Sequence, residues 1–374
     1  MKVDFRSQER WPVGLRIRLM GCLWRLWRKD KLVLGRAVEH FERALAEYVG
    51  GHRIAVTVGS GTDAIYLSLS ALGIGPGSET IAPANVCVAV VESVLRTGAT
   101  LRFVDIRPDT YTMDPAEVSK AINSRTQALL PVHTYGLPAD IDEIGTLARE
   151  NGLKIVELCG QAFGATFHGY PVGSFGDAAC FSFNPSKILS GGGDGGAVLT
   201  PFPDLAERIR RLRDHGRLFI GDDAEFPGIS SRLDTLNARI LLERLRYITK
   251  ELTRRRDMAT YYRSLLPARI KRQSEPAQRN SVYQFLVVET DNREQIRSAL
   301  KKRGIETKVH YRLPYKMPGY QGSTLLKGME SLKITEEVGN RIMTLPFYTY
   351  FRKQDAEYVC QTLTEVQDRR IDGP

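Results

Sequence analysis

The sequence predicts an α/β protein in which a mostly parallel sheet is covered by helices and followed by a smaller α+β unit. From Ile54 onward, short apolar strands alternate with helical patterns as far as Thr200. Such alternation is typical of parallel strands that are connected by helices. Beyond a long charged helix the alternation changes, and this second region is expected to form the smaller unit.

The strands are expected where apolar and β-branched residues form short runs between turns. Ile54–Val58 is the first such run, and Lys154–Glu157 has apolar neighbours that indicate burial on both faces. Gly196–Thr200 is expected as the hairpin or parallel neighbour of the strand before it. The remaining strands of the sheet are expected at 80–82, 101–105, 128–132 and 178–183.

Helical spacing of apolar residues predicts the connecting segments. Phe41, Leu45 and Val49 share one face of a helix over 37–48, which Gly50 and Gly51 end. Further helices are expected at 63–72, 86–96, 115–122, 141–151 and 205–213, before an aperiodic loop over 215–231. One long helix is then expected from Asp234 to about Leu265.

The smaller unit is expected to contain strands at 283–288 and 307–310 and helices at 293–303 and 354–368. We therefore predict three parts: a basic N-terminal arm at 1–32, a large α/β domain at 33–245 and a small α+β domain at 246–374.

Composition indicates an ordinary globular protein with ample core, since 42% of its 374 residues are hydrophobic and 26% are charged. The five cysteines are scattered without metal-like clustering, so we expect reduced thiols, no metal site and a cytoplasmic location. No secretory signal is expected, because the first thirty residues lack an uninterrupted apolar core. No segment has the uncharged length of ~20 residues that a membrane span needs.

The net charge of +10 is unevenly distributed. Residues 1–31 hold nine Lys and Arg against three acidic residues, which leaves only about +4 for the remainder. No basic stripe with interleaved aromatic residues recurs later, so a nucleic-acid-binding body is not expected. The segment 12–29 is predicted to form a basic amphipathic helix with Trp24 and Trp27. It could lie on a membrane surface, but packing on its own protein or on a partner subunit is favoured.

The stretch FSFNPSKILSGGGDGG at 181–196 carries the first chemical signal. Phe181 and Phe183 have the alternation of a strand, which Pro185 breaks shortly before Lys187 and a run of glycines. An amine at a stiff strand end can reach one carbonyl carbon, as a Schiff base with pyridoxal phosphate requires. The alternative is a solvated lysine on a flexible loop. Asp194, within the glycine run, is expected to fix the turn.

A second signal is Gly59-Ser60-Gly61-Thr62-Asp63, where a strand passes into a helix. Small residues at such a turn expose backbone N–H groups and can hold a phosphate. Ligands in parallel sheets bind at the carboxyl ends of the strands. The turns at 59, 83, 133, 158 and 185 all follow expected strands, so they are candidates to converge on one site.

With these motifs in view, the chain resembles the DegT/StrS family of nucleotide-sugar aminotransferases over about residues 33–366. The resemblance rests on LGRAVEHFERALAEYVG, GSGTDAIYLSLSALGIGPGSE, FVDIRPDTYTMDP, PVHTYGLPADIDEI, FSFNPSKILSGGGDGG, SSRLDTLNA and GIETKVHY. It implies the aspartate-aminotransferase fold of type I, with a sheet of the seven-stranded type in the large domain, where the cofactor binds. It also implies pyridoxal 5'-phosphate as cofactor, a keto sugar on a nucleotide diphosphate as acceptor, glutamate as donor, and homodimers with shared active sites.

The resemblance assigns roles to individual residues. Lys187 matches the catalytic Schiff-base lysine, Gln161 matches the glutamine beside the cofactor's phenolic oxygen, and Ser182 matches part of the phosphate cradle. Gly61 and Thr62 complete this cradle together with their neighbour Ser60. His133, His215, His310 and Tyr311 lie in turns that could meet the substrate, although a structural role for His133 remains an alternative.

Four positions depart from the family's pattern. Leu158 stands where an aspartate pairs with the pyridine nitrogen, and Cys87 stands where an aromatic residue or histidine stacks on the ring. Ile188 and Ser230 stand where the family has two asparagines. In the family, the asparagine at the position of Ser230 binds the cofactor phosphate of the neighbouring subunit. Glu157 could replace the missing acid only if its strand slipped by one residue, because neighbours on a strand face opposite sides.

These departures leave three hypotheses open. The first is an aminotransferase that makes an amino sugar, with Lys187 moving the proton between cofactor and sugar. The second is an enzyme of the same fold with other chemistry, such as a dehydratase that tolerates a neutral pyridine. The third is a non-catalytic protein that binds sugar nucleotides or partners another subunit. The sequence indicates neither the sugar, nor the nucleotide, nor the carbon that is aminated.

Overall fold

The structure of the chain is a computed structural model that describes residues 1–5, 13–14, 16–18, 20–21, 31–50, 52–217 and 223–368. Most of the helix expected at 12–29, with Trp24 and Trp27, lies outside the described residues. None of the described helices combines the length and the apolar character that a bilayer crossing requires.

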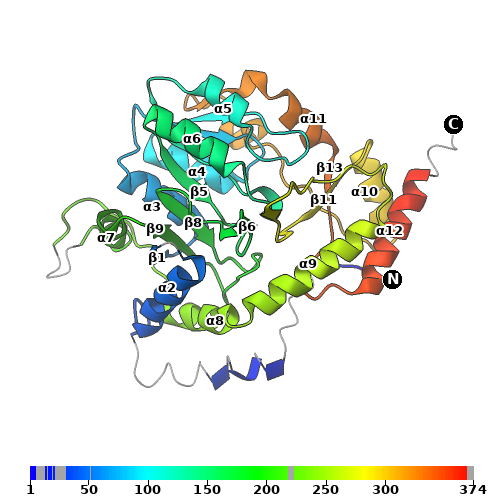
Figure 1. Cartoon of the computed structure of the whole chain (residues 1–374), viewed down its shortest axis with the longest axis horizontal. Coiled ribbons are helices and arrows are strands. Elements are labelled where there is room, and N and C mark those ends of the chain that lie inside the picture. Colours follow the sequence, from blue (N-terminus) through cyan, green and yellow to red (C-terminus); the bar gives the residue numbers. More distant parts are fainter. Residues whose placement is uncertain are drawn as a thin grey trace.

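A large mixed sheet forms the centre of the molecule (Figure 1). In spatial order its strands are β1 (Ile54–Val58), β9 (Gly196–Thr200), β8 (Ala178–Ser182), β5 (Lys154–Leu158), β4 (Thr126–Leu129), β2 (Glu79–Pro83), β3 (Thr100–Val104) and β12 (Leu326–Lys327). All neighbouring pairs are parallel except those of β9, which is antiparallel to both β8 and β1. The mostly parallel sheet is thus confirmed, and β9 is a hairpin neighbour rather than a parallel one.

Helices cover both faces of this sheet, and the alternation of side chains along each strand divides the core between them. In β2, Ile81 packs in one apolar cluster with the helices α5 and α6, while Ala82 packs in another with α3 and α4. The helices around the sheet are α2 (Arg36–Val49), α3 (Gly61–Ala71), α4 (Val88–Thr97), α5 (Pro115–Ala121), α6 (Ile141–Asn151), α7 (Pro203–Leu212) and α8 (Thr235–Leu245). Because the strands are buried on both faces, the sheet is a rigid platform.

The C-terminal part has a core of its own, in which the short antiparallel pair β11 (Leu286–Glu289) and β13 (Ile342–Leu345) packs with helices. Figure 1 shows α9 (Ile248–Leu265) beside α12 (Lys353–Asp368), and α10 (Arg293–Lys302) and α11 (Lys333–Arg341) complete the helices. A small sheet joins β6 (Thr166–Phe167), β7 (Tyr170–Pro171) and β10 (Arg279–Asn280). The division into domains stays a prediction, and β12 shows that the later chain returns to the large sheet.

Two predicted elements differ in the structure. The strand expected at 307–310 is only an isolated bridge between Lys308 and Thr344. The prediction of one long helix from Asp234 to Leu265 is wrong, because the structure has two helices there, α8 and α9. At the break the amide of Tyr247 donates to the carbonyl oxygen of Arg244 at 3.0 Å, so the α-helical hydrogen-bond pattern is replaced by a tighter turn. The buried guanidinium of Arg244 beside it bonds to the carbonyl oxygen of Ile188, 3.1 Å away, and to Glu251 on the next helix at 2.9 Å.

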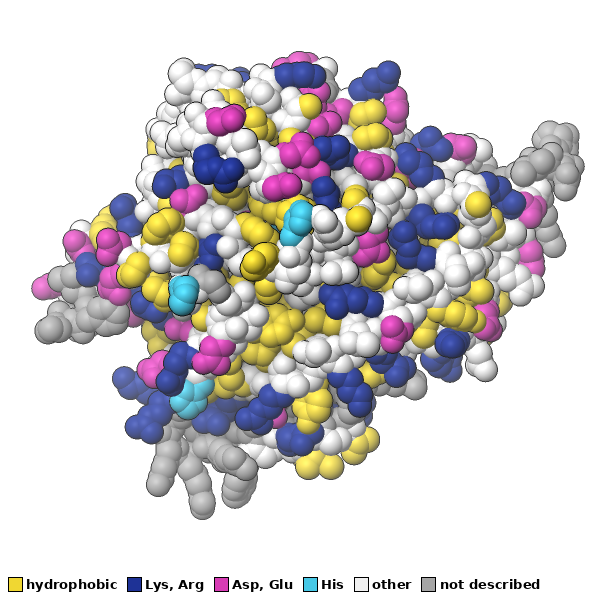
Figure 2. All heavy atoms as spheres, in the orientation of Figure 1, with side chains coloured by type: hydrophobic (Ala, Val, Ile, Leu, Met, Phe, Trp, Pro, Cys, Tyr) yellow, Lys and Arg dark blue, Asp and Glu magenta, His cyan; other side chains and the backbone are white. Residues whose placement is uncertain are grey.

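The surface carries charges of both signs. On the face shown in Figure 2, Lys and Arg side chains are interspersed with Asp and Glu. Among the described residues, exposed charges are paired within the protein, as in Arg303 with Glu365 and Arg246 with Glu243.

Candidate active site

The direction of the strands explains why distant segments meet at one edge of the sheet. β1, β2, β4, β5 and β8 all run the same way, so the residues that follow them emerge together. β9 runs in the opposite direction and begins at this edge, where Gly196 lies opposite both Val58 and Ser182. The turns that the sequence analysis expected to converge therefore do so, as the rule for ligands in parallel sheets requires.

A cavity of about 260 Å³ lies at this edge. It is lined by eight residues that the sequence analysis assigned to the cofactor: Ser60, Gly61, Thr62, Cys87, Leu158, Gln161, Ser182 and Lys187. The other lining residues are Ile65, Val86, Ala89, Val90, Val132, Gly160, Cys180, Phe181, Asn184, Ser186 and Asp194. The structure thus brings together side chains from five separate segments of the chain.

One end of the cavity is the N-terminus of α3. The hydroxyl oxygen of Ser60 caps the helix by accepting a hydrogen bond from the amide of Asp63 at 3.0 Å. A Cβ atom at Gly61 would lie 2.6 Å from Cβ of Ser182, so only glycine permits this approach of helix and strand. Amides of a first helical turn lack partners within the helix, which makes this end suited to an anion.

The loop that carries Lys187 is held from three sides. Its own turn is closed by the amide of Lys187, which donates to the carbonyl oxygen of Asn184 at 2.8 Å. Gln284 donates from Nε2 to the carbonyl oxygen of Ser186 at 2.8 Å. Asn237 accepts from the amide of Gly192 and donates to the carbonyl oxygen of Asp194, at 2.8 and 2.7 Å. These contacts oppose the alternative of a flexible loop, because they fix the backbone on both sides of the lysine.

The sequence analysis did not single out Asn237 or Gln284. Asn237 lies in the quoted motif SSRLDTLNA, but nothing in the sequence shows that its amide reaches across to the glycine run. Gln284 lies outside all the motifs quoted above. Asp194 was expected to fix the turn, and its carboxylate accepts a hydrogen bond from Nδ2 of Asn184 at 2.7 Å.

Gln161 is buried and oriented by the turn after β4. Its Oε1 accepts a hydrogen bond from the amide of Tyr135 at 2.9 Å, so Nε2 is the end able to donate toward the cavity. The hydroxyl of Tyr135 donates to the carbonyl oxygen of His310. His310 and Tyr311 do not line the cavity. The ring of His310 stacks on Phe285, and the ring of Tyr311 packs against Tyr135. Tyr135 therefore connects both residues to Gln161 in the cavity wall.

His133 and Glu157 form a buried pair beneath the cavity. The two side chains are fully buried, with 3.2 Å between Nε2 of His133 and the carboxylate of Glu157. Nδ1 of His133 accepts from the amide of Ala139 at 3.0 Å, so both ring nitrogens have partners within the fold. The structure therefore gives His133 a structural position and does not place it among the residues that line the cavity.

The carboxylate of Glu157 also accepts hydrogen bonds from three backbone amides, those of Gly173, Phe175 and Gly176, at 2.6 to 2.8 Å. Burial alone would raise the pKa of Glu157, but the hydrogen bonds from His133 and from the amides of Gly176 and Gly173 together lower it. Because Leu158 faces the cavity and Glu157 is held on the other face, the strand has not slipped to offer Glu157 to a ligand.

The lowered pKa of Glu157 predicts an acid-sensitive fold. Between the unfolded pKa near 4.5 and the lower folded pKa, the unfolded chain binds more protons, so stability falls as pH falls through this window. Glu157→Gln should remove this part of the acid dependence and cost about 1–3 kcal/mol at neutral pH, since an amide cannot accept from all four donors. Urea unfolding at several pH values measures both effects. The exposed Glu143→Gln is the control, and equal behaviour of the two variants would contradict this account.

Two other predicted residues lie away from the cavity in this chain. Ser230 and His215 are exposed on the segments at either side of residues 218–222, and the amide of His215 donates to the carbonyl oxygen of Ile229 at 3.1 Å. The neighbouring Ser231, which sequence reasoning did not select, accepts from the amide of Gly59 at 2.9 Å and donates to Asp63 at 2.8 Å. It thus anchors the turn before α3.

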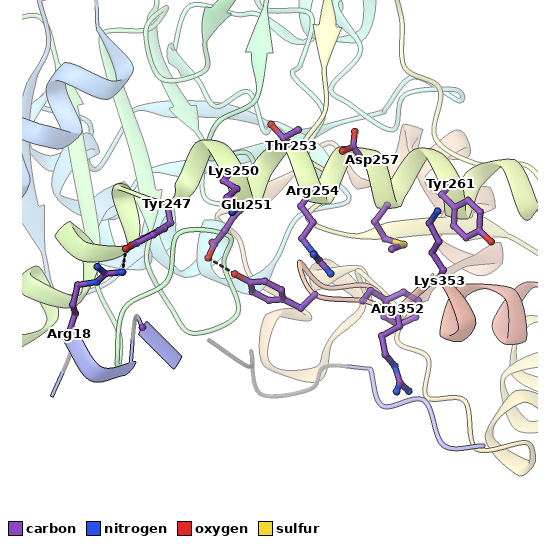
Figure 3. A pocket seen from close by; sticks show the side chains of 14 residues that line it. Arg18, Tyr247, Lys250, Glu251, Thr253, Arg254, Asp257, Tyr261, Arg352 and Lys353 are labelled. Carbon is purple, nitrogen blue, oxygen red and sulfur yellow. Dashed lines mark hydrogen bonds between the residues drawn. The ribbon is translucent and has the colours of Figure 1, made fainter. Parts of the chain in front are cut away.

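A larger cavity of about 1030 Å³ lies elsewhere, between α9, the described part of the N-terminal segment and the start of α12 (Figure 3). In its wall Tyr350 donates a hydrogen bond to Glu251 at 3.2 Å, and Figure 3 shows Arg18 hydrogen-bonded to Tyr247. None of the predicted site residues lines it. The smaller cavity, which contains the lysine, is therefore the candidate active site.

Comparison with known proteins identifies the family of the chain. The sequence model of the DegT/DnrJ/EryC1/StrS aminotransferase family matches residues 21–364. The chain is 34% identical to the UDP-2-acetamido-2-deoxy-3-oxo-D-glucuronate aminotransferase of Pseudomonas aeruginosa, over 97% of this chain and 99% of that protein. It is similar to the crystal structure of Streptomyces venezuelae DesV in complex with a ketimine intermediate, with a TM-score of 0.92, 38% identity and coverage of 97% and 98%. It is also similar to Bacillus subtilis NtdA with bound cofactor PMP, with a TM-score of 0.89, 29% identity and coverage of 98% and 85%. The chain belongs to the DegT/DnrJ/EryC1/StrS aminotransferase family.

Proposed function

We propose that the chain is a pyridoxal-phosphate-dependent enzyme that transfers an amino group to a keto sugar on a nucleotide diphosphate. The observation that carries this proposal is the single cavity in which Lys187, Gln161 and the N-terminus of α3 meet. The family and the UDP-sugar aminotransferase among the relatives support the same activity. The dehydratase-like and non-catalytic hypotheses receive no support from these comparisons.

The residues of the cavity fit pyridoxal phosphate. A volume of about 260 Å³ is close to the lower end of the ~300–1,000 Å³ of ligand pockets, which suits one small ring with a phosphate. The close approach of Gly61 to Ser182 leaves a cradle that a Cβ atom would fill. We propose that Ser60, Gly61, Thr62 and Ser182 hold the phosphate, because they line the same cavity as the lysine.

When bound, pyridoxal phosphate supplies an aldehyde carbon that takes up the amino group and a ring that withdraws electrons from the breaking bond. Nζ of Lys187 would hold this aldehyde carbon. Once displaced by the amine of a substrate, the same nitrogen would accept a proton from the donor's carbon and return one to the carbon of the sugar. Nε2 of Gln161 would donate to the phenolic oxygen and so keep the ring in register with the lysine.

The experiment that tests this function is a two-substrate assay on the holoenzyme. The purified chain is incubated with pyridoxal phosphate, L-glutamate and a panel of UDP- and dTDP-linked keto sugars. Mass spectrometry then follows the amino sugar, and a coupled assay follows 2-oxoglutarate. We expect both products in equal amounts for at least one sugar. Loss of the keto sugar by elimination of water, without 2-oxoglutarate, would favour the dehydratase-like hypothesis instead.

We further propose that the protein is a homodimer. Ser230, which matches a position that the family uses across the subunit interface, is exposed in the single chain, and the cavity wall contains no residue of this loop. A partner copy would bring this loop to the phosphate of the neighbouring site. Light scattering at micromolar concentration should give the mass of two chains, and a stable, active monomer would refute the proposal.

The thiols support a cytoplasmic location, which we also propose. Cys87, Cys159, Cys180 and Cys360 are all free, and the last three are buried. Free buried thiols are typical of reducing compartments. Cell fractionation would check this, and recovery of the protein outside the cytosolic fraction would contradict it.

A further inference from the structure

The lysine cavity is lined by polar and by apolar residues. Its apolar lining includes Ile65, Val86, Val90, Val132, Leu158 and Cys180. Leu158 is only 5% exposed and lies opposite Cys180 in the parallel register of β5 and β8. A heteroaromatic ring that enters the cavity therefore meets aliphatic carbon where its nitrogen would need a polar partner.

The ionisable side chains among the described residues that line the cavity are Cys87, Cys180, Lys187 and Asp194. Asp194 is the one carboxylate among them. It lies in the glycine run after the lysine and is already bonded to Asn184. In pyridoxal phosphate the ring nitrogen is para to the aldehyde carbon, so an aldehyde held by Lys187 would direct the nitrogen away from the lysine and from Asp194 in the same loop.

The nearest alternatives are also excluded. Glu157 lies next to Leu158 in β5, but its carboxylate is held on the opposite face by His133 and three backbone amides. The thiol of Cys180 lies 3.4 Å from the hydroxyl of Ser68, and burial raises its pKa to about 12. It is therefore neutral and cannot act as an anionic partner. Lys187 is a cation or a covalent partner and would disfavour a second positive charge.

We infer that this cavity keeps the pyridine nitrogen of its cofactor unprotonated, and that Leu158 is the residue that determines this state. This inference rests on the proposed function. Without an anion beside it, the charged form of the ring would be buried unpaired, which favours the neutral form. A neutral pyridine withdraws electrons less strongly than a pyridinium. The proton transfer at Nζ of Lys187 must therefore proceed with less help from the ring than in a site with a carboxylate at position 158.

The test uses pyridoxal phosphate labelled with ¹⁵N in the ring. The holoenzyme, Leu158→Asp and Leu158→Asn are compared by ¹⁵N NMR across the pH range in which each is folded. We expect the wild-type resonance at the position of a neutral pyridine, without a change with pH. Leu158→Asp should shift it to the pyridinium position. Leu158→Asn has the same shape as the aspartate variant but no acid, so it should leave the resonance near the neutral position.

Each outcome bears on the inference. A pyridinium resonance in the wild type would overturn it while leaving the proposed function intact. An unchanged resonance in a folded Leu158→Asp holoenzyme would show that another residue sets the protonation state. Failure of the wild type to bind the labelled cofactor at all would refute the proposed function, and the inference would fall with it. The wild-type spectrum alone decides the main point, so the test survives a variant that does not fold.

Discussion

Lys187→Ala is expected to abolish amino transfer while leaving the fold intact. The loss should exceed the ~10²–10⁴-fold that a positioned acid–base group typically supplies, because the variant loses covalent attachment as well as the proton carrier. The fold should survive, since the side chain is partly exposed and the loop is held by Asn237 and Gln284 through backbone atoms. Single-turnover kinetics with L-glutamate and circular dichroism measure the two effects.

Two control variants sharpen this experiment. Lys187→Arg keeps the positive charge but cannot form the covalent link, so it should be as inactive as the alanine variant. Lys154→Ala removes a half-exposed lysine at the opposite end of β5, where it pairs with Asp177 at 3.2 Å. It should retain wild-type activity. Wild-type rates in Lys187→Ala would remove this lysine from the mechanism.

Gly196→Ala is expected to disrupt the cofactor site through a clash with backbone atoms. A Cβ atom there would lie 2.3 Å from the carbonyl oxygen of Ser60 and 2.9 Å from the amide of Gly61. These are backbone atoms at the N-terminus of α3, so they cannot rotate aside as a side chain would. The cost should be about 1–3 kcal/mol of stability, with a matching loss of affinity for pyridoxal phosphate.

Gly193 provides the matched control for this substitution. It lies three residues earlier in the same run, and a Cβ atom there would have no neighbour within 4 Å. Gly193→Ala should therefore bind the cofactor like the wild type. Fluorescence titration with pyridoxal phosphate and urea unfolding of both variants separate affinity from stability. If the two alanine variants behave alike, the approach of β9 to α3 is not what shapes the cradle.

Local patterns in the sequence were sufficient to predict the mostly parallel sheet and the meeting of the cavity residues at one edge of it. The alternation of Glu157 and Leu158 along one strand predicted that they face opposite sides, and the structure confirms it through the partners of Glu157. Likewise, small residues between β1 and α3 predicted the turn that brings Ser60, Gly61 and Thr62 to the strand ends. Such features depend on contacts between near neighbours, which sequence patterns encode directly.

Contacts between distant segments were not predictable in the same way. The helical pattern continues through Arg246 and Tyr247 without a glycine or proline, yet the helix is interrupted there. Beside the interruption, the buried Arg244 bonds to Ser190 and Ile188, which are distant in the sequence. His133 was expected near the substrate, but its ring instead pairs with the buried carboxylate of Glu157. A buried carboxylate needs hydrogen-bond partners, and this need is not visible in the sequence. Asn237 supports the lysine loop from about forty residues away.

The central claim is that Lys187 binds pyridoxal phosphate in the cavity at the strand ends. The most direct measurement is borohydride reduction of the wild-type holoenzyme, followed by proteolysis and mass spectrometry. The account predicts one modified peptide, with the reduced cofactor on Lys187 and none on Lys154 or Lys250. Modification spread over several exposed lysines, or attachment to a lysine outside this cavity, would contradict it.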